Sequence, residues 1–465
     1  MRIANPGRNS VVGQAVSPVG ASVLLVEDAS GFRGQADEIV TPHSEAEVIA
    51  FLRRASETAT PVTIAGAGTG VTGGRVPLSG ALLSLEKLNR LEIRPGIAVA
   101  GPGVLLAELH AAAAATGQFY PPDPTETSAS LGGTIATNAS GSRSFRYGDT
   151  RRHVLRLRVV LMNGRVLDVR RGDAVDFPVS AIPIPQTTKH TAGYRLSPGM
   201  DWIDLFVGSE GTLGIVTEAE LRLLPSPADF LAGVVFFADD AAAIDAVEVW
   251  RAEAQARMLE YFDRPSLDLL RTQFPEIPAG AGAAILFEEE SADVDVWHSR
   301  LAASGALLDD SWFATTAADR ERFRRFRHAL PELVNAAVRR NGFMKLGSDY
   351  AVPIARNREM LAEYRRRLEG QFPYVIFGHI GDAHLHGNIL PASQEQFSRG
   401  QALMLEFARY AVALGGTVSA EHGLGKRKAH LLKLQYTGEQ IDAMKRVKRR
   451  LDPQWLLGQG TLFPL

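Results

Sequence analysis

The segment with the richest chemistry is a short run of histidines near position 380. His379, His384 and His386 lie within eight residues, in a chain that has 11 histidines. Residues two apart on a strand share a face, so His384, His386 and Asn388 are expected to point the same way. A turn at Gly381-Asp382 can fold His379 back toward His386. Imidazoles that converge with an added carboxylate suit zinc, manganese or iron; the alternative is a surface turn with solvated histidines.

A second segment places an acid and a base side by side. Glu421 and His422 stand among small residues in the stretch 419–426. Neighbours in an extended stretch point in opposite directions, so Glu421 can ligate a metal while His422 faces a substrate. The alternative is a plain loop that precedes a helix at Lys428.

A glycine-rich loop, residues 65–74, follows an apolar run at 61–65 that reads as a strand. Backbone N–H groups in such a loop can cradle a pyrophosphate, because no Cβ blocks the approach. The loop continues into Arg75-Val76-Pro77, which prevents a helix from starting there, and it lacks the Lys-Ser/Thr ending of a P-loop. The sequence therefore indicates a nucleotide-binding architecture other than these two; the alternative is a flexible surface loop.

Two later segments repeat this small-residue chemistry. Residues 121–125 form a rigid proline-rich stretch that leads into 128–141, where small residues let the backbone lie against a flat ring, and residues 208–215 resemble it before another strand. In this order, the three segments resemble the FAD-binding domain of the vanillyl-alcohol oxidase / p-cresol methylhydroxylase superfamily. The resemblance implies that the first loop wraps the pyrophosphate and that the later segments line the adenine, ribose and isoalloxazine.

The same resemblance assigns the FAD contacts. Family members that attach the flavin often use a histidine in or near the glycine loop; this loop has none and the chain has no cysteine, so noncovalent FAD is expected. Residues 189–194 also resemble a family segment near the flavin. The implied cofactor-binding residues are Ala67, Gly68, Thr69, Gly70, Val71, Thr72, Gly73, Pro122, Asp123, Thr127, Ser128, Gly132, Gly133, Ala136, Asn138, Ser140, Glu210, Gly211, Gly214 and Ile215.

The histidine segments narrow the resemblance. They are similar to the C-terminal half of FAD-linked D-2-hydroxyacid dehydrogenases, a group that includes D-lactate and D-2-hydroxyglutarate dehydrogenases and a glycolate oxidase subunit. The family pattern is His-x-Gly-Asp-x-Asn-x-His-x-Asn, followed later by Glu-His-Gly. It implies that His379, His386 and Glu421 bind a divalent metal, zinc or manganese, and that His422 is the catalytic base.

Two further features concern the substrate side of this segment. By the resemblance, Asn388 contacts the substrate. His384 stands where the family has Asn, which would either add a fourth ligand or alter substrate contacts.

An α-hydroxy acid needs a cation for its carboxylate, and arginine supplies a bidentate fork. The stretch 326–331 resembles the family's arginine segment, which places Arg327 on the substrate carboxylate. The stretch 342–349 resembles the following lysine segment and implies Lys345, although the spacing to Pro353 is shifted. The other arginines of 320–325 are interpreted as a solvated helix face.

The resemblance implies oxidation of a D-2-hydroxy acid to the 2-oxo acid. The metal lowers the pKa of the hydroxyl, His422 takes its proton, and the Cα hydride moves to flavin N5. Reoxidation needs an electron-transfer flavoprotein, a quinone or a cytochrome. Two alternatives stay open: a non-redox transferase like alkyl-dihydroxyacetonephosphate synthase, and a noncatalytic FAD-binding subunit of an oxidase complex.

Composition sets the outer limits. The chain has 465 residues, 45% hydrophobic and 22% charged, with a formal net charge of −2, so we expect a globular protein that does not bind nucleic acid. The absence of cysteine excludes disulfides, thiolate nucleophiles and iron–sulfur clusters. Residues 1–7 lack the layout of a signal peptide, and no apolar run is long enough to span a membrane. We expect a cytoplasmic enzyme; peripheral membrane contact and a homodimer stay open.

The elements that position these residues predict an α+β fold. Strands and helices alternate over 38–109, Asn163-Gly164 marks a hairpin, and Pro225-Ser226-Pro227 marks a boundary. We expect a two-subdomain α/β FAD-binding domain of p-cresol methylhydroxylase type (1–226), an antiparallel-sheet cap domain for the substrate (227–410) and a helical C-terminal segment that carries the Glu-His motif (411–465). The predicted helices include 44–58, 104–116, 241–257, 320–340 interrupted at Pro331, 356–368, 400–414 and 437–451.

Overall fold

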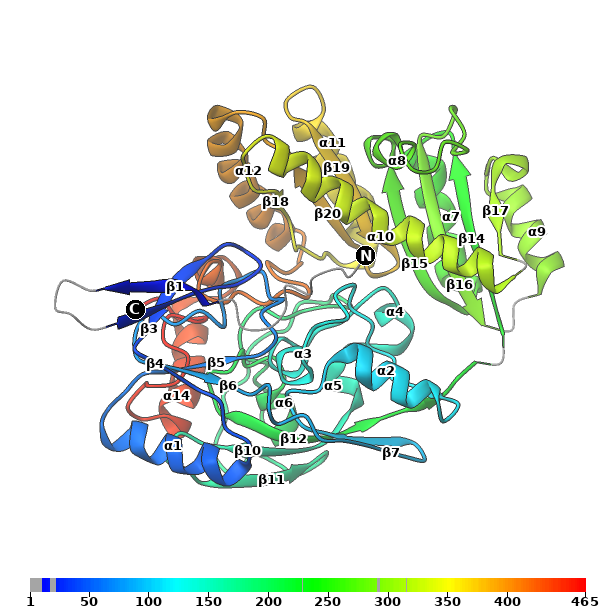
Figure 1. The fold of residues 1–465 in the computed structure, drawn as a ribbon. Helices are drawn as coiled ribbons and strands as arrows, with labels where there is room; N and C mark the ends of the chain where they lie inside the picture. The colour runs from blue at the N-terminus through cyan, green and yellow to red at the C-terminus, as the bar shows by residue number, and fades with distance from the viewer. Residues whose placement is uncertain (1–10, 17–21, 228, 291–292, 315) are drawn as a thin grey trace.

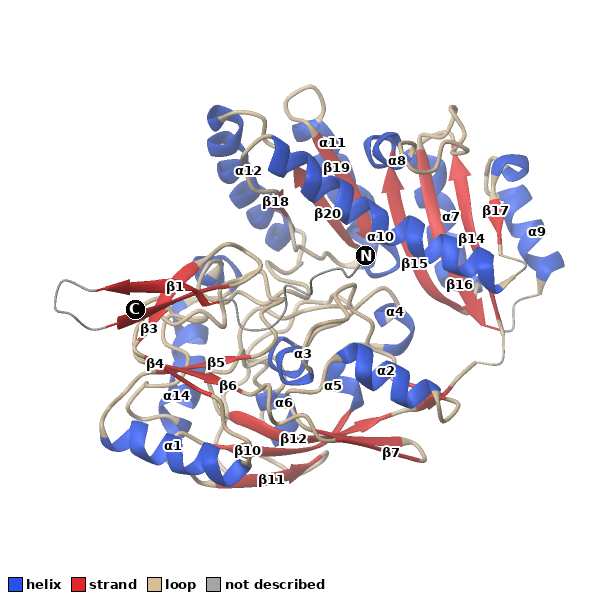
Figure 2. Cartoon of the chain, viewed as in Figure 1, coloured by secondary structure: helices blue, strands red, loops and turns tan. Residues whose placement is uncertain are grey.

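The computed structural model describes residues 11–16, 22–227, 229–290, 293–314 and 316–465, and the segment 1–7 discussed above lies outside them. The chain forms two halves, drawn one above the other in Figure 1, and its C-terminal segment returns to the lower half, where the N-terminal elements lie. Loops gather between the two halves (Figure 2). The mixture of helices and largely antiparallel sheets agrees with the predicted α+β class.

A small parallel sheet holds the glycine loop. Its order is β4-β6-β5, with bounds Glu38–Val40, Ala81–Ser84 and Val62–Ala65. Helix α1 (Glu45–Glu57) connects the first two parallel strands in chain order; the Ser44 side chain caps its N-terminus and Val48, Phe51 and Leu52 are buried on its inner face. The chain end adds to this sheet, because Val62 N–H donates to the Leu456 carbonyl. The C-terminal helix α14 (Gly438–Leu451) lies beside the sheet (Figure 1).

A five-stranded antiparallel sheet also belongs to the lower half. Strands β10 (Val154–Val160) and β11 (Val166–Arg170) form a hairpin that turns at Asn163-Gly164, as predicted, with Gly164 at a φ of 79°. Short helices α2 (Leu106–Ala114), α3 (Leu131–Thr137), α5 (Thr150–His153) and α6 (Trp202–Phe206) belong to this half (Figure 1). The sheet order is β11-β10-β12-β8-β7, with bounds Val166–Arg170, Val154–Val160, Ile215–Arg222, Ile97–Ala100 and Leu91–Arg94.

A seven-stranded sheet forms the upper half, and each of its strand pairs is antiparallel. Alternate residues of its strands enter two different hydrophobic clusters, one shared with α8 (Arg264–Leu270) and α10 (Ala317–Arg340), the other with α7 (Asp240–Glu253) and α11 (Asn357–Leu368). The order is β17-β14-β16-β15-β19-β20-β18, with bounds Trp312–Phe313, Phe230–Phe237, Ala283–Glu290, Ala256–Asp263, Tyr374–His379, His384–Ile389 and Leu346–Gly347.

Three predicted element bounds are wrong in this half. The helix expected to reach Arg257 ends at Glu253, and Ala256 begins the central strand β15, which is buried along its whole length. Helix α10 continues through Pro331 without interruption; proline removes one backbone hydrogen bond, but the buried apolar face of the helix holds both of its parts to the sheet. Helix α12 (Gln394–Ala413) begins six residues earlier than expected, because the Ser393 side chain caps it.

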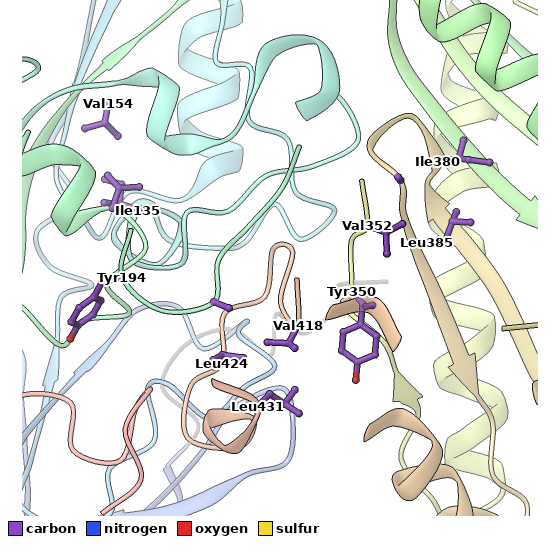
Figure 3. Close-up of a cluster of buried hydrophobic side chains, with 14 of the residues drawn as sticks. Ile135, Val154, Tyr194, Tyr350, Val352, Ile380, Leu385, Val418, Leu424 and Leu431 are labelled. Atoms are coloured by element: carbon purple, nitrogen blue, oxygen red, sulfur yellow. The ribbon is translucent and has the colours of Figure 1, made fainter. Parts of the chain in front are cut away.

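One continuous hydrophobic cluster supports the segments that carry the candidate site. Val418 and Leu424 flank the Glu421-His422 turn. Ile380 begins the turn at 380–382 between His379 and His384, and Leu385 follows it (Figure 3). Because their neighbours are buried, both turns are held by packing on each side. Other members of the cluster shown in Figure 3 are Ile135, Val154, Tyr194, Tyr350, Val352 and Leu431. In the part of the chain that is described, no helix has the length and apolar character needed to cross a membrane.

Candidate active site

A single cavity of about 370 Å³ joins the glycine loop to the histidine segment. Its lining includes His379, Glu421 and His422 at one place and the small residues of the lower half at another. Most of the residues predicted to contact FAD line it: Ala67, Gly68, Thr69, Gly70, Val71, Thr72, Gly132, Gly133, Ala136, Ser140, Glu210, Gly211 and Gly214. The cavity therefore offers one continuous space for an extended cofactor and a small substrate.

Seven residues predicted to contact FAD are not among the described residues that line the cavity. Gly73 donates its N–H to Asp28 Oδ2 at 2.6 Å, and Asp123 pairs with Arg143 at 2.5 Å. Asn138 has a backbone conformation in the left-handed region; its side chain donates a hydrogen bond to Asp149 and accepts one from the Arg151 backbone N–H. These three have a visible role in shaping the loops. The others are Pro122, Thr127, Ser128 and Ile215.

The cavity lining also contains residues that the sequence did not single out. Ser130 makes no side-chain cap bond to α3 but accepts a hydrogen bond from the Ala67 N–H at 3.2 Å, so it ties the glycine loop to the start of that helix. Gly66 lies against the same hydroxyl, and a Cβ there would come within 2.4 Å of Ser130 Oγ. A side chain at Gly66 would therefore displace the Ser130 hydroxyl from its hydrogen bond with the Ala67 N–H.

Three side chains from distant segments converge beside this cavity. The Nε2 atoms of His379 and His386 lie 3.5 and 3.6 Å from Glu421 Oε1. Strand pairing brings the histidines together, because β19 and β20 pair across the turn at 380–382, as the sequence predicted. The turn that carries Glu421 belongs to the C-terminal segment. Asp349 Oδ1 accepts a hydrogen bond from the Glu421 backbone N–H at 3.2 Å.

Each of these histidines has an acceptor on its other ring nitrogen. His379 Nδ1 lies 2.5 Å from Glu260 Oε1, and His386 Nδ1 lies 2.9 Å from the Ser348 carbonyl oxygen. Such partners hold the proton on Nδ1 and leave the Nε2 lone pair free, as in histidines that bind a metal. The donor set of two imidazole nitrogens and one carboxylate oxygen therefore fits a divalent ion such as zinc.

The charges around the cluster favour a cation at its centre. Burial disfavours the charged form of His379, but Glu260 and Glu421 outweigh it and raise the pKa of that imidazole to about 9. Burial likewise opposes the Glu421 carboxylate, yet Lys189 and His379 hold its pKa well below the ordinary value. The carboxylates thus keep their negative charge, and a metal ion would compete with the proton on His379.

Lys189 fixes the second oxygen of Glu421. Its buried ammonium lies 3.1 Å from Glu421 Oε2 and 3.4 Å from Asp382 Oδ2, and it also donates to the Gly141 carbonyl. Ser140 donates to the same Glu421 oxygen at 3.1 Å. With Oε2 held in this way, Oε1 faces the histidines. The sequence placed the Lys189 segment near the flavin but did not indicate this contact.

His422 is placed beside the cluster and lines the cavity. Its backbone N–H donates to Asp349 Oδ2 at 3.0 Å, its Nε2 lies 3.8 Å from Glu421 Oε1, and its ring stacks on His386 at 5.8 Å between centroids. One third of its side chain is exposed. Burial lowers the pKa of His422 to about 4, so the imidazole is neutral near pH 7 and can accept a proton.

The three residues predicted to bind the substrate occupy two places. Arg327 reaches the cluster through Glu260, whose Oε2 accepts its Nε–H at 3.2 Å. Lys345 and Asn388 both lie close to Gly347. If Gly347 had a Cβ atom, that atom would lie 2.8 Å from Asn388 Oδ1 and 3.7 Å from Lys345 Cε. Burial lowers the pKa of Lys345 to about 8. None of the three is among the described residues that line the cavity.

Two acids that organise the site were missed. Glu260 lies on β15, in a stretch for which the sequence predicted no element, and contacts both His379 and Arg327. Asp349 accepts hydrogen bonds from Ser419 Oγ and from two backbone N–H groups of the Glu421-His422 turn.

Comparison with known proteins places this arrangement in a family. Residues 36–170 match the family described as an FAD binding domain, and residues 226–462 match the C-terminal domain of FAD linked oxidases. The chain belongs to the FAD-linked oxidase family and is an FAD-linked oxidoreductase. Among solved structures, an alkyldihydroxyacetonephosphate synthase has a TM-score of 0.66 at 17% identity, covering 90% of this chain and 76% of its own, which shows the fold alone.

Relatives match over nearly the whole chain. Glycolate oxidase subunit GlcD of Bacillus subtilis is 31% identical over 471 residues, covering 96% of this chain and 93% of the relative. D-lactate dehydrogenase of Archaeoglobus fulgidus is 32% identical, covering 91% and 90%. D-2-hydroxyglutarate dehydrogenase of Xanthomonas citri is 31% identical, covering 91% and 89%.

Proposed function

We propose that this chain oxidises a small D-2-hydroxy acid to its 2-oxo acid with FAD as hydride acceptor and a divalent ion as Lewis acid. The observation that carries the proposal is the convergence of His379, His386 and Glu421 beside His422, next to the cavity that the glycine loop also lines. The names of the relatives, which include D-lactate dehydrogenase and D-2-hydroxyglutarate dehydrogenase, support the same substrate class.

The residues divide the work as follows. His379, His386 and Glu421 would hold the ion, and the small residues lining the cavity would hold FAD. When bound, the ion lowers the pKa of a hydroxyl and FAD supplies the hydride acceptor. His422, neutral and next to the cluster, takes the hydroxyl proton at its imidazole nitrogen.

Recognition of the substrate carboxylate falls to Arg327. Glu260 accepts from its Nε, and among the described residues no hydrogen bond engages its two terminal nitrogens, so they can make a bidentate contact. Lys345 and Asn388 both lie close to Gly347 and would contact the remaining part of the acid. Electrons leave reduced FAD to an electron-transfer flavoprotein, a quinone or a cytochrome; the name of the relative GlcD, a subunit, supports a protein partner.

An anaerobic screen of D- and L-2-hydroxy acids tests the proposal. The purified holoenzyme is mixed with each acid, and bleaching of the flavin band near about 450 nm, a property of the cofactor itself, is followed. We expect at least one D-acid to bleach the flavin and to yield one 2-oxo acid per FAD, while its L-enantiomer does not. A non-redox transferase or a noncatalytic subunit would leave the flavin oxidised with every acid.

A further inference from the structure

His384 is a buried histidine that the roles above do not use. It lies on β20 directly opposite His379 in the strand ladder, and its side chain has no exposed surface. Neither of its ring nitrogens makes a hydrogen bond within the described residues. Its Nε2 lies 3.2 Å from Asp349 Oδ1, but the two groups are not aligned for a hydrogen bond. A buried polar group without a partner is unusual and calls for an explanation.

The position of His384 relative to the other ligands supplies that explanation. One ring nitrogen of His384 lies within 4.8 Å of the ligand atoms of His379, His386 and Glu421, as all four do of one another. The ring centroids are 5.5 Å apart for His379 and His384, 4.4 Å for His384 and His386, and 5.8 Å for His379 and His386.

These separations are those of imidazoles that share an ion. Rings bound through one nitrogen to a common zinc about 2.1 Å away have centroids roughly 4.5 to 6 Å apart. The ring planes meet at 41°, 63° and 74°, so the three imidazoles approach from different directions and do not stack. His422, whose ring lies nearly parallel to His386 at 18°, does not share this arrangement.

The outer contacts of two of the rings follow one scheme, and an acidic oxygen lies near the third. His379 has Glu260 and His386 has the Ser348 carbonyl on the nitrogen that faces away from the centre. Asp349, next in sequence to Ser348, lies near His384, with 3.2 Å between its Oδ1 and His384 Nε2. An acceptor on the outer nitrogen fixes the inner nitrogen of a metal-binding histidine.

We propose that His384 is a fourth protein ligand, which makes the site three imidazoles and one carboxylate. The inference rests on the metal site of the proposed function and extends it. Imidazole suits zinc, copper, iron and nickel, whereas carboxylate and water suit manganese and magnesium. A nitrogen-rich site therefore selects zinc over manganese, and zinc can still expand its coordination to accept a substrate oxygen.

X-ray absorption at the zinc edge of the wild-type holoenzyme tests the proposal without any variant. The expected spectrum contains the scattering of three imidazole rings at about 2.0–2.1 Å. Two rings would overturn the proposal, with His384 then packing against Asp349 only. A zinc site without imidazole would overturn the metal site as a whole.

A pair of variants gives a second, independent measurement. His384→Asn is compared with His153→Asn, because His153 is also buried and also has one ring nitrogen without a partner, yet lies outside the cavity lining. Affinities for zinc and manganese are measured by chelator competition on the FAD-loaded, metal-stripped protein. We expect His384→Asn to weaken zinc binding at least tenfold and manganese binding by less. His153→Asn should leave both affinities within twofold.

The outcomes separate this inference from the proposed function. Unchanged zinc affinity and unchanged zinc-over-manganese preference in His384→Asn would refute the fourth ligand while wild-type flavin reduction by a D-2-hydroxy acid stays intact. If no 2-hydroxy acid reduced the flavin of the wild-type protein, the proposed function would be refuted. The count of imidazoles at the zinc would still decide the role of His384. If His384→Asn does not fold, that count alone decides it.

Discussion

Glu260 offers the sharpest perturbation, because one carboxylate serves both the metal cluster and the substrate arginine. Its Oε1 lies 2.5 Å from His379 Nδ1 and its Oε2 accepts from Arg327 Nε at 3.2 Å, and only 6% of the side chain is exposed. Burial opposes the charge, but His379 and Arg327 outweigh it and lower the pKa of Glu260 to about 2. Glu260 is therefore a charged positioning residue at neutral pH.

The substitution Glu260→Gln keeps the shape of the side chain but leaves it one acceptor oxygen in place of two. Both partners donate, whereas an amide has one acceptor oxygen and one donor nitrogen, so either His379 or Arg327 must face an N–H group. Loss of a hydrogen bond to a charged group costs about 1.5–3 kcal/mol, which corresponds to roughly 10- to 150-fold in an equilibrium constant. Loss of an outer partner of a metal ligand falls in the same range, about 10- to 100-fold.

The assay measures metal binding and substrate binding on the same protein. Zinc affinity is measured by chelator competition, and the apparent substrate Kd and the limiting rate come from stopped-flow flavin reduction. Glu288→Gln is the matched control, because Glu288, on the adjacent strand β16, is a half-buried carboxylate that also binds an arginine, Arg143, and has no histidine among its described contacts. We expect Glu260→Gln to lose at least tenfold in zinc affinity or substrate affinity. Values within twofold of the wild type for both would refute the bridging role.

Three further predictions concern the cofactor, the ligands and the base. Mild acid should release all FAD from the precipitated protein, since the glycine loop has no histidine and the chain no cysteine; flavin that stays with the pellet would contradict noncovalent binding. His379→Ala and Glu421→Ala should lower metal content and turnover together while FAD content is unchanged, and a verified metal-free protein with normal turnover would contradict a metal-assisted reaction. His422→Asn should keep FAD, metal and substrate affinity but reduce flavin on the order of 10² to 10⁴ times more slowly; a rate per bound FAD within a few-fold of wild type would assign His422 to packing of its turn.

Period-two spacing was sufficient to predict much of the site. The turn at Gly381-Asp382 returns the chain so that His379 pairs with His384, and the histidines meet as expected. The Glu421-His422 turn reaches them because apolar residues on both sides, Val418 and Leu424, are buried. Small residues in a fixed order similarly indicated the cofactor cavity, because only small side chains allow the backbone to approach a ligand.

Glu260 was not predictable from its neighbours. Strand β15 contains Arg257, Glu260 and Asp263, so it shows neither alternation nor a continuous apolar run, and it follows directly after a helix. These polar groups are buried because partners distant in the sequence satisfy them: His379 and Arg327 bind Glu260, and the Ile376 N–H binds Asp263. Local patterns carry no information on such long-range pairs, which is why the strand and the acid were missed together.

The most direct test of the central claim is flavin reduction with and without the metal. The holoenzyme is stripped of divalent ions with its FAD retained, and the anaerobic rate of flavin reduction by a D-2-hydroxy acid and by its L-enantiomer is measured before stripping, after stripping and after zinc is restored. We predict reduction by the D-acid only, a loss of at least about 100-fold on stripping, since a Lewis acid supplies several kcal/mol, and recovery on adding zinc. Reduction at an equal rate in the stripped protein, or no reduction by any 2-hydroxy acid, would contradict the account.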